Sequence, residues 1–190
     1  KPEFKPYFKS PFSPGTTKWG TSNNIIGTSN GNGAMMRISP IGYLFDKEED
    51  VIKNAKLATI PSHNSIEAIE CATLVALIIF YARNNLSKEE IINKLNIEYQ
   101  YKPFTKFNMT CSETIDNCLY ALFTSNSYEE SIRKIISYGR DTDTNACITG
   151  SMAEVLYGID KNLINDVNKY LPKKFVKKLE IGYSKINKLI

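Results

Sequence analysis

A length of 190 residues is enough for one domain with a substantial core, so we expect residues 1–190 to form a single domain. Its 42% hydrophobic and 23% charged residues, with a mild formal net charge of +4, are ordinary for a soluble globular protein; they exclude disordered, collagen-like and coiled-coil chains. The longest apolar run, Ala72 to Ala82, is too short to cross a bilayer and predicts a buried helix instead.

The pattern along the chain changes once, near Ala34. Residues 1–33 are rich in proline, glycine, serine and asparagine, which are typical of loops. From Ala34 onward the apolar residues recur at helical spacing, although Tyr99 to Phe107 could be extended. We therefore predict an all-α domain of packed, non-coiled helices. The clearest helical ranges are 47–58, 64–83, 142–157, 160–170 and 173–183.

Local signals predict where two further helices begin and where one of them ends. Ser87 followed by Glu90, and Ser127 followed by Glu130, have the spacing of capping boxes. Gly139 follows the second of these helices and is placed as its C-terminal cap. A third helix is indicated around residues 115–122 by apolar residues three and four apart.

The cysteines indicate the cellular compartment, and the first residue indicates whether the chain is complete. Four cysteines without a CxxC pair, beside one histidine, argue against a disulfide-stapled secreted fold and a zinc site. We expect reduced thiols and a cytoplasmic location, with no signal peptide. Because the chain starts at Lys1 inside a loop-like stretch, we also expect it to be a fragment of something longer. The cysteines are Cys71, Cys111, Cys118 and Cys147.

The segment 139–146 concentrates carboxylates and hydroxyls at the start of a predicted helix. If Asp141 begins that helix, then Asp141, Asp143 and Thr144 could converge at its first turn. Three such oxygen ligands suit a hard cation such as Mg²⁺. The alternative is structural, because Asp and Thr are also favoured N-caps and acidic residues suit a helix N-terminus.

A glycine-containing loop at 28–37 leads from irregular sequence into a helix. Its glycines would allow backbone N–H groups to approach an anion, as in a phosphate cradle. It lacks the Lys-Ser/Thr ending of a nucleotide-binding P-loop, and a plain Asn-Gly turn is the alternative.

His63 precedes the most apolar helix and is the single histidine in the chain. With Glu67 one helical turn later, it is a candidate general acid or base. The alternative is a turn residue, with Asn64 or Ser65 as the N-cap of the helix.

The last thirty residues contain eight lysines but two acidic residues. One interpretation is a nucleic-acid patch, and the other is the solvated face of an amphipathic helix. No aromatic stacking motif accompanies the lysines, so we favour the solvated face and expect neither nucleic acid nor membrane as a partner.

In this order, the three segments resemble the ADP-ribosylglycohydrolase family, which includes the dinitrogenase-reductase-activating glycohydrolases. The family's Ser-x-Gly-Asn-Gly-x-x-Met-Arg loop corresponds to Ser29–Arg37. Its Ser/Thr-His segment corresponds to Ser62–His63, and its Gly-Gly-Asp-x-Asp-Thr metal motif to Gly139–Thr144. The resemblance extends from about Ser13 to Gly158.

The resemblance implies a compact, all-helical orthogonal bundle whose cleft holds two Mg²⁺ ions and ADP-ribose, and an enzyme that hydrolyses the glycosidic bond to a modified protein side chain. It implies metal ligation by Asp141, Asp143 and Thr144. It further implies a diphosphate held by the backbone from Ser29 to Gly33, a loop or ligand oriented by Asn32, and His63 in the same cleft. The residues implied to bind the ligand are Ser29, Asn30, Gly31, Asn32, Gly33, His63 and, from a looser match, Gly15 with Thr16.

Two departures from the family pattern shape these expectations. Arg140 replaces the second glycine of the metal motif. The family's Thr-Asp-Asp ligands and its acidic catalytic residue lie upstream of the glycine loop, where this chain has Glu3 as its single acidic residue. We therefore expect about half of the metal site, catalytic residues in a missing N-terminal part, and no turnover by this chain alone.

The alternative is a non-catalytic ADP-ribose-binding or crystallin-like structural relative. The presence of Asp141, Asp143 and Thr144 together argues against such a decayed relative, because a purely structural helix start would not need all three. The sequence leaves open whether the acceptor is arginine, serine or another residue.

Overall fold

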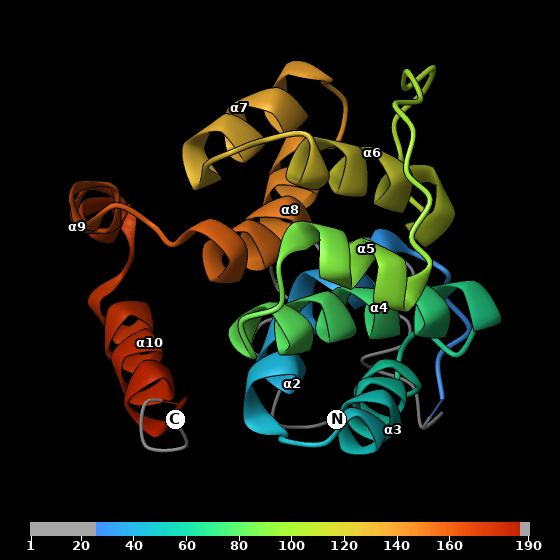
Figure 1. The fold of residues 1–190 in the computed structure, drawn as a ribbon, viewed down its shortest axis with the longest axis horizontal. Helices are drawn as coiled ribbons and strands as arrows, with labels where there is room; N and C mark the ends of the chain where they lie inside the picture. The colour runs from blue at the N-terminus through green and yellow to red at the C-terminus, as the bar shows by residue number, and fades with distance from the viewer. Residues whose placement is uncertain (1–25, 187–190) are drawn as a thin grey trace, which may run out of the picture.

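The computed structural model describes residues 26–186. These residues form nine α-helices and a short 3₁₀ helix, joined by loops without a β-sheet, so the predicted all-α fold is confirmed. Figure 1 shows α4 and α5 in the middle of the molecule, with α6, α7 and α8 on one side and α2 and α3 on the other. The elements are η2 (Asn32–Arg37), α2 (Ser39–Leu44), α3 (Glu48–Thr59), α4 (Ile66–Arg83), α5 (Lys88–Leu95), α6 (Cys111–Phe123), α7 (Tyr128–Ser137), α8 (Thr142–Tyr157), α9 (Lys161–Tyr170) and α10 (Lys173–Ile186).

The five predicted helical ranges correspond to α3, α4, α8, α9 and α10, and the range 142–157 coincides with α8. The helix predicted around residues 115–122 is α6. The segment 99–107 forms no strand and belongs to the long loop between α5 and α6. This loop matters below because its last residues pack against the glycine loop.

Helix α4 is the centre of the core and is apolar on every side. All residues from Val75 to Ala82 are buried, because η2, α2, α3, α5, α6 and α8 all pack against this helix. Helix α2 approaches especially closely: a β-carbon on Gly42 would lie 2.6 Å from the carbonyl oxygen of Ala76. The predicted buried helix is therefore confirmed. Among residues 26–186 no helix has the length and apolarity needed to cross a membrane.

Side-chain caps fix the starts of α5 and α6. Ser87 and Glu90 form the predicted reciprocal capping box: the Ser87 hydroxyl accepts from the Glu90 N–H, and the Glu90 carboxylate accepts from the Ser87 N–H. Thr110 and Glu113 form a second reciprocal box that opens α6. Its Thr-x-x-Glu spacing is visible in the sequence, although we did not predict it. It places the N-terminus of α6 beside the glycine loop.

The cap of α7 differs from the prediction. The Ser127 hydroxyl accepts from the Glu130 N–H at 3.1 Å, but the Glu130 carboxylate accepts from the Asn126 N–H at 2.8 Å instead of completing the box. Gly139 follows α7 with φ of +76°, as its predicted role at the end of the helix requires.

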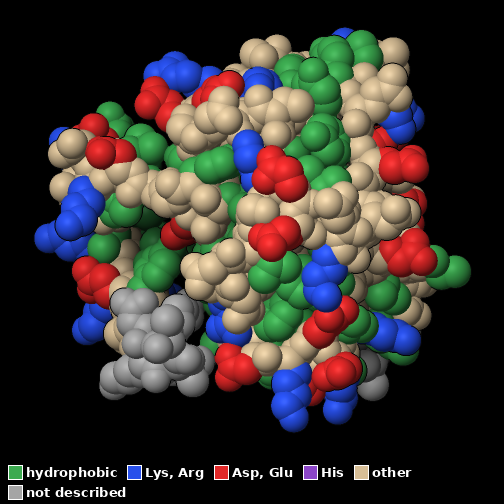
Figure 2. Space-filling model, in the orientation of Figure 1, with side chains coloured by type: hydrophobic (Ala, Val, Ile, Leu, Met, Phe, Trp, Pro, Cys, Tyr) green, Lys and Arg blue, Asp and Glu red, His purple; other side chains and the backbone are tan. Residues whose placement is uncertain are grey.

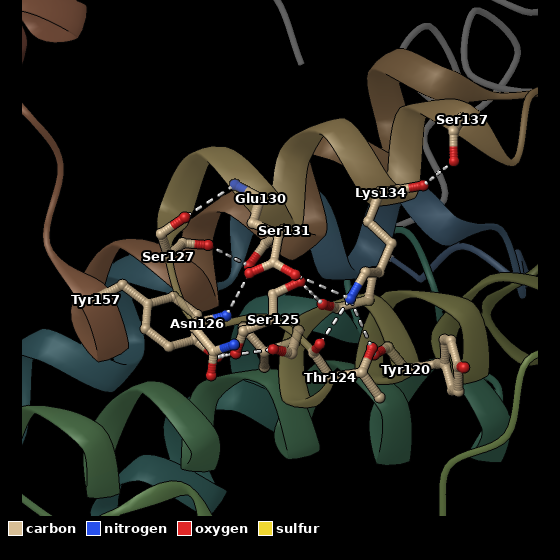
Figure 3. A network of polar contacts seen from close by, with 12 residues as sticks. Tyr120, Thr124, Ser125, Asn126, Ser127, Glu130, Ser131, Lys134, Ser137 and Tyr157 are labelled. Atoms are coloured by element: carbon tan, nitrogen blue, oxygen red, sulfur yellow. Dashed lines mark hydrogen bonds and ion pairs between the residues drawn. The ribbon is translucent and has the colours of Figure 1, made fainter.

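A network of polar contacts ties the turn between α6 and α7 to the end of α8 (Figure 3). The Lys134 ammonium donates to the carbonyl oxygen of Thr124 at 2.6 Å and lies 3.1 Å from its hydroxyl. The Tyr157 hydroxyl lies 2.7 Å from the carbonyl oxygen of Leu122 and 2.8 Å from that of Ser125. These contacts add side-chain donors to carbonyl groups at the end of α6, and they hold α6, α7 and α8 as one unit.

Helices α9 and α10 stand beside this body as a separate lobe (Figure 1). Helix α9 buries none of its residues. A groove of about 790 Å³ lies between the lobe and α7 and α8, and Figure 2 shows hydrophobic side chains around this hollow. Four lysines of α10 are exposed and do not line the groove: Lys173, Lys174, Lys177 and Lys178. Its apolar lining consists of Tyr128, Ile132, Ile136, Ile159, Leu163, Ile164, Val167, Leu171, Val176, Leu179 and Tyr183.

Candidate functional site

The glycine loop is held on both sides by main-chain hydrogen bonds, so its shape is set by the fold. On one side Thr28 forms an isolated antiparallel bridge with His63. On the other side Gly31 forms one with Thr110, just before α6. A β-carbon on Gly27 would lie 2.2 Å from a carbonyl oxygen of the adjoining segment, so the close approach at the start of the loop requires glycine there.

The buried side chain of Asn32 joins the glycine loop to the N-terminus of α8. Its amide nitrogen lies 2.9 Å from the Asp141 carboxylate, 3.2 Å from the Asn108 carbonyl oxygen and 3.3 Å from the Thr114 hydroxyl. Asn32 and Asp141 are 109 residues apart in the sequence. The contact therefore brings two of the three motifs into one place and anchors the glycine loop to the start of α8.

Asn108 extends this network to the first turns of α8. Its amide nitrogen donates to the Asn145 side-chain oxygen at 2.7 Å and to Thr114 at 2.9 Å, while its side-chain oxygen accepts from the Asp141 N–H at 3.3 Å. Asn108 and Asn145 are fully buried. Buried amides with this many partners fix the side chains that they contact.

Asp141 occupies the N-cap position of α8, yet its side chain does not cap the helix. The carboxylate turns instead to Asn32 and is almost completely buried. The Asp141 side chain therefore does not act as the helix cap that the structural alternative assumed. Along the same turn Thr144 is buried and Asp143 is exposed.

The oxygen atoms at this helix start suit part of a site for a hard cation. Two carboxylates and a hydroxyl are ligands that Mg²⁺ prefers, and all three are within the first turn of α8. Within residues 26–186, no three acidic, cysteine or histidine side chains cluster as a complete metal site. These three oxygen atoms would leave the other coordination positions of such an ion to water, substrate or further ligands.

His63 lies on the opposite side of the glycine loop with a defined proton arrangement. Its Nδ1 is 3.1 Å from the Arg37 guanidinium and 2.7 Å from the Ser62 hydroxyl. Because a guanidinium can only donate, Nδ1 is an acceptor and the ring proton belongs on Nε2. A β-carbon placed on Gly31 or Gly33 would lie 3.6 or 3.7 Å from that Nε2. The imidazole N–H therefore faces the loop.

The His63 ring is neutral over most of the pH range. Burial, and secondly the positive charge of Arg37, lower its pKa from 6.5 to about 4. The helix cap is a different residue, because the Ser65 hydroxyl accepts from the Ala68 N–H at 3.1 Å. His63 is thus not the N-cap of α4; it is placed as a hydrogen-bond donor at neutral pH.

Glu67 is not the partner of His63. Its carboxylate accepts from the Ser112 N–H at 2.7 Å and from the Asn30 side chain at 3.3 Å. The hydrogen bond from the Ser112 backbone is the main cause that lowers the Glu67 pKa. Glu67 is an ionised carboxylate at the N-terminus of α6, where it ties the loop to that helix.

Some N–H groups of the glycine loop donate within the protein, and others stay available to a ligand. The N–H of Ser29 donates to Ser62, that of Asn32 donates to Met109, and that of Gly31 donates to the Ser29 hydroxyl at 3.0 Å. In the predicted range from Ser29 to Gly33, the N–H groups of Asn30 and Gly33 have no hydrogen-bond partner among residues 26–186. Gly15, with Thr16 and the rest of that predicted loop, lies outside the described residues.

Arg140 adopts φ of +68°, a conformation that favours glycine. This explains why a glycine at this position suits the turn into α8. Its side chain is exposed and its Nε lies 3.4 Å from the Phe104 carbonyl oxygen, in the loop before α6. Arg140 in place of glycine therefore strains the backbone at this position.

Two residues important to this arrangement were missed from the sequence. Asn108 and Thr114 belong to no spacing pattern, since their contacts with Asn32 join residues 76 and 82 positions apart. Arg37 belongs to the loop motif, but its contact with His63 was not predicted. One signal was present: the capping box at Thr110 marks the start of α6, and Thr114 is one turn further on.

Three comparisons with known proteins each find similarity to ADP-ribosyl hydrolases or related proteins. The sequence model of the family described as ADP-ribosylglycohydrolase matches residues 5–189. A curated relative, ADP-ribosylarginine hydrolase Tri1 of Pseudomonas putida (strain GB-1), is 25% identical over 156 residues, which cover 74% of this chain and 42% of the relative. A solved structure titled ADP-ribosylglycohydrolase-related protein complex has the same fold, with a TM-score of 0.65 at 18% identity. The match covers 82% of this chain and 62% of that structure, so the chain spans less than two thirds of both relatives.

Replacing Asn32 with alanine should destabilise the protein by about 1–3 kcal/mol, because the buried Asp141 carboxylate would lose a donor. Urea denaturation measures this change in the free energy of unfolding. Asn30→Ala is the matched control, since Asn30 is exposed, and should stay within about 0.5 kcal/mol of the parent protein. Equal effects of the two substitutions would contradict the role given to Asn32.

Arg140→Gly should stabilise the protein by about 1 kcal/mol, because glycine adopts positive φ without a β-carbon clash. Thermal unfolding should show a rise in Tm of about 2–4 °C. Arg140→Ala removes the same charge but keeps the β-carbon, so it should give no such rise. A matching gain with alanine would show that the side chain, not the backbone, is responsible.

The ring protons of His63 should titrate in an NMR experiment with a midpoint near pH 4, and the assignment is unambiguous because the chain has one histidine. Since protonation favours the unfolded state, the His63 contribution to stability is fully present above pH 6.5 and is lost as the pH falls toward 4. Arg37→Gln should raise the midpoint, whereas Arg133→Gln on α7 should leave it unchanged. A midpoint close to 6.5 in the parent protein would refute the description of a buried, neutral ring.

Proposed function

Because the chain belongs to the ADP-ribosylglycohydrolase family, we propose that it forms the ADP-ribose-binding part of a Mg²⁺-dependent hydrolase. The bond broken is the glycosidic bond between ADP-ribose and a modified protein side chain. The hydrogen bond between Asn32 and Asp141 carries the proposal, because it brings a phosphate-binding type of loop to a set of metal-type ligands.

The ADP-ribose diphosphate would lie over the glycine loop. The N–H groups of Asn30 and Gly33 would donate to its oxygens. The Nε2–H of His63 faces the same side of the loop and would add a third, neutral donor. Arg37 holds that ring in place and adds positive charge close to an anionic ligand.

Asp141, Asp143 and Thr144 would hold Mg²⁺ at the start of α8. When bound, the ion supplies Lewis-acid polarisation at the ribose end of the ligand. Asn32 keeps the Asp141 carboxylate turned toward the loop, so the cation would lie next to the diphosphate. The second ion and its remaining ligands would come from the part of the protein that precedes this chain.

The carboxylate that acts as acid or base is expected in the same preceding part. Glu67, whose carboxylate contacts Asn30 of the loop, already accepts two hydrogen bonds and has a lowered pKa, so it is poorly suited to give or take a proton. We therefore propose binding without turnover for this chain alone. ADP-ribosylarginine is the first acceptor to test in the longer protein, because it is the substrate in the name of the curated relative. A cytoplasmic location stays a prediction.

ADP-ribose with Mg²⁺ should raise the Tm of this chain. At a ligand concentration of about 100 Kd the stabilisation is about 2.7 kcal/mol, or a shift of about 5–10 °C for a chain of this size. Asp143→Ala should remove the Mg²⁺-dependent part of that shift while leaving the helical circular dichroism unchanged, since Asp143 is exposed and its carboxylate makes no hydrogen bond among residues 26–186.

Asp160→Ala is the matched control, because Asp160 is an aspartate that caps α9 outside the site. It should keep the full ligand-induced shift. An unchanged shift in Asp143→Ala would refute the metal assignment. Binding of ADP-ribose by the longer protein without Mg²⁺-dependent release of ADP-ribose from a modified side chain would favour the non-catalytic alternative.

A further inference from the structure

Arg140 has a backbone conformation that its residue type seldom adopts. In the part of the chain that the structure describes, the residues other than glycine with positive φ are Asn85, Asn96 and Arg140. Asparagine tolerates this conformation because its short side chain can hydrogen-bond locally. Arginine has no such compensation and is strained at φ of +68°. Backbone strain of this kind clusters at active sites and ligand-binding sites, which points to a role for the Arg140 side chain.

The Arg140 guanidinium is an exposed cation without an acidic partner. It forms no ion pair with the acidic residues of the range 26–186. Its Nε lies 3.4 Å from the Phe104 carbonyl oxygen, so the N–H groups on its two terminal nitrogens are left for another partner. Lys102 and Lys106 of the same α5–α6 loop differ, because each of them pairs with an acidic residue of α6.

The two aspartates that follow Arg140 do not use its charge either. The Asp141 carboxylate lies 2.9 Å from the Asn32 amide nitrogen, and Asp143 is exposed without an ion pair to Arg140. Arg140 comes directly before the first of these aspartates. An unpaired positive charge therefore lies at the edge of the proposed Mg²⁺ site, next to the part of the ligand that the ion would contact.

We propose that Arg140 is a specificity-determining residue, which makes the site favour ADP-ribose linked to an uncharged acceptor such as serine over ADP-ribose linked to the positively charged guanidinium of arginine. The assignment rests on the proposed function, because it needs the ribose end of the ligand at Asp141 and Asp143. The acceptor is bonded to that ribose, so its linking group would lie beside the Arg140 side chain.

Repulsion between two cations at this place is large enough to measure. Unit charges about 4 Å apart in water interact with an energy that corresponds to about a fivefold change in affinity. A hydroxyl-linked acceptor carries no charge, and its oxygen can accept from the free N–H groups of the guanidinium. The same residue thus acts against one acceptor and in favour of the other. Because Arg140 is exposed, salt should screen its effect.

The test measures how tightly this chain binds two capped peptides that differ in the modified residue alone, ADP-ribosylserine in one and ADP-ribosylarginine in the other. Isothermal titration calorimetry with Mg²⁺ gives both dissociation constants, with free ADP-ribose as the reference ligand. At low salt the parent chain should bind the serine-linked peptide about fivefold more tightly. In about 1 M salt, where the Debye length is about 3 Å, the ratio should fall toward one.

Three variants at position 140 separate charge from backbone conformation, because all of them keep a β-carbon at the strained position. Arg140→Lys keeps the charge and should keep the preference. Arg140→Gln removes the charge and should bring the ratio of the two dissociation constants close to one, and Arg140→Glu should reverse it. Arg133→Gln is the matched control, since Arg133 is an exposed arginine on α7 outside the site. This control should leave the ratio at the parent value.

Three results would each overturn the role of Arg140: equal affinities of the parent chain at low salt, tighter binding of the arginine-linked peptide, and an unchanged ratio in Arg140→Gln. If free ADP-ribose still binds in such a case, the proposed function stands and the specificity assignment alone is lost. If free ADP-ribose does not bind, both are lost.

Discussion

The hydrogen bond from Asn32 to Asp141 is the interaction on which the candidate site depends. It is buried, it joins segments that are 109 residues apart, and it determines where the carboxylate at the start of α8 points. Without it, Asp141 would be free to cap its own helix, as aspartate at that position normally does. Asn108 supports the arrangement from a third segment, because it holds the Asp141 N–H and the Asn145 side chain together.

Charges around the loop are arranged so that the ligand side is neutral or positive. Burial and, secondly, the charge of Arg37 keep the pKa of His63 low, and Glu67 is directed to the backbone of α6. The Glu67 carboxylate therefore accepts hydrogen bonds from N–H groups and not from the imidazole. An anionic ligand would meet the imidazole N–H and the guanidinium on one side and the metal-type ligands on the other.

The sequence predicts the helices well because their signals are local. Apolar spacing locates α3, α4, α8, α9 and α10, and the box at Ser87 starts α5 as expected. The site is only partly predictable. Its three motifs are recognisable, yet the contacts between them depend on Asn108 and Thr114, which have no local signature. The expected link from His63 to Glu67 follows sequence proximity, whereas the structure pairs each of them with a residue from a different segment.

The lobe of α9 and α10 gives the molecule an uneven distribution of stability. Its apolar side chains line an open groove, and α9 has no buried residue, so little burial opposes its separation from the body. Helix α4, in contrast, is enclosed on all sides. Such a chain unfolds in cooperative units of different free energy, with the lobe opening long before the core. The glycine loop and the start of α8 belong to the more stable unit, the core, because they are bound to α4 and α6. The candidate site would therefore persist in a partly open species that has already released its C-terminal helices.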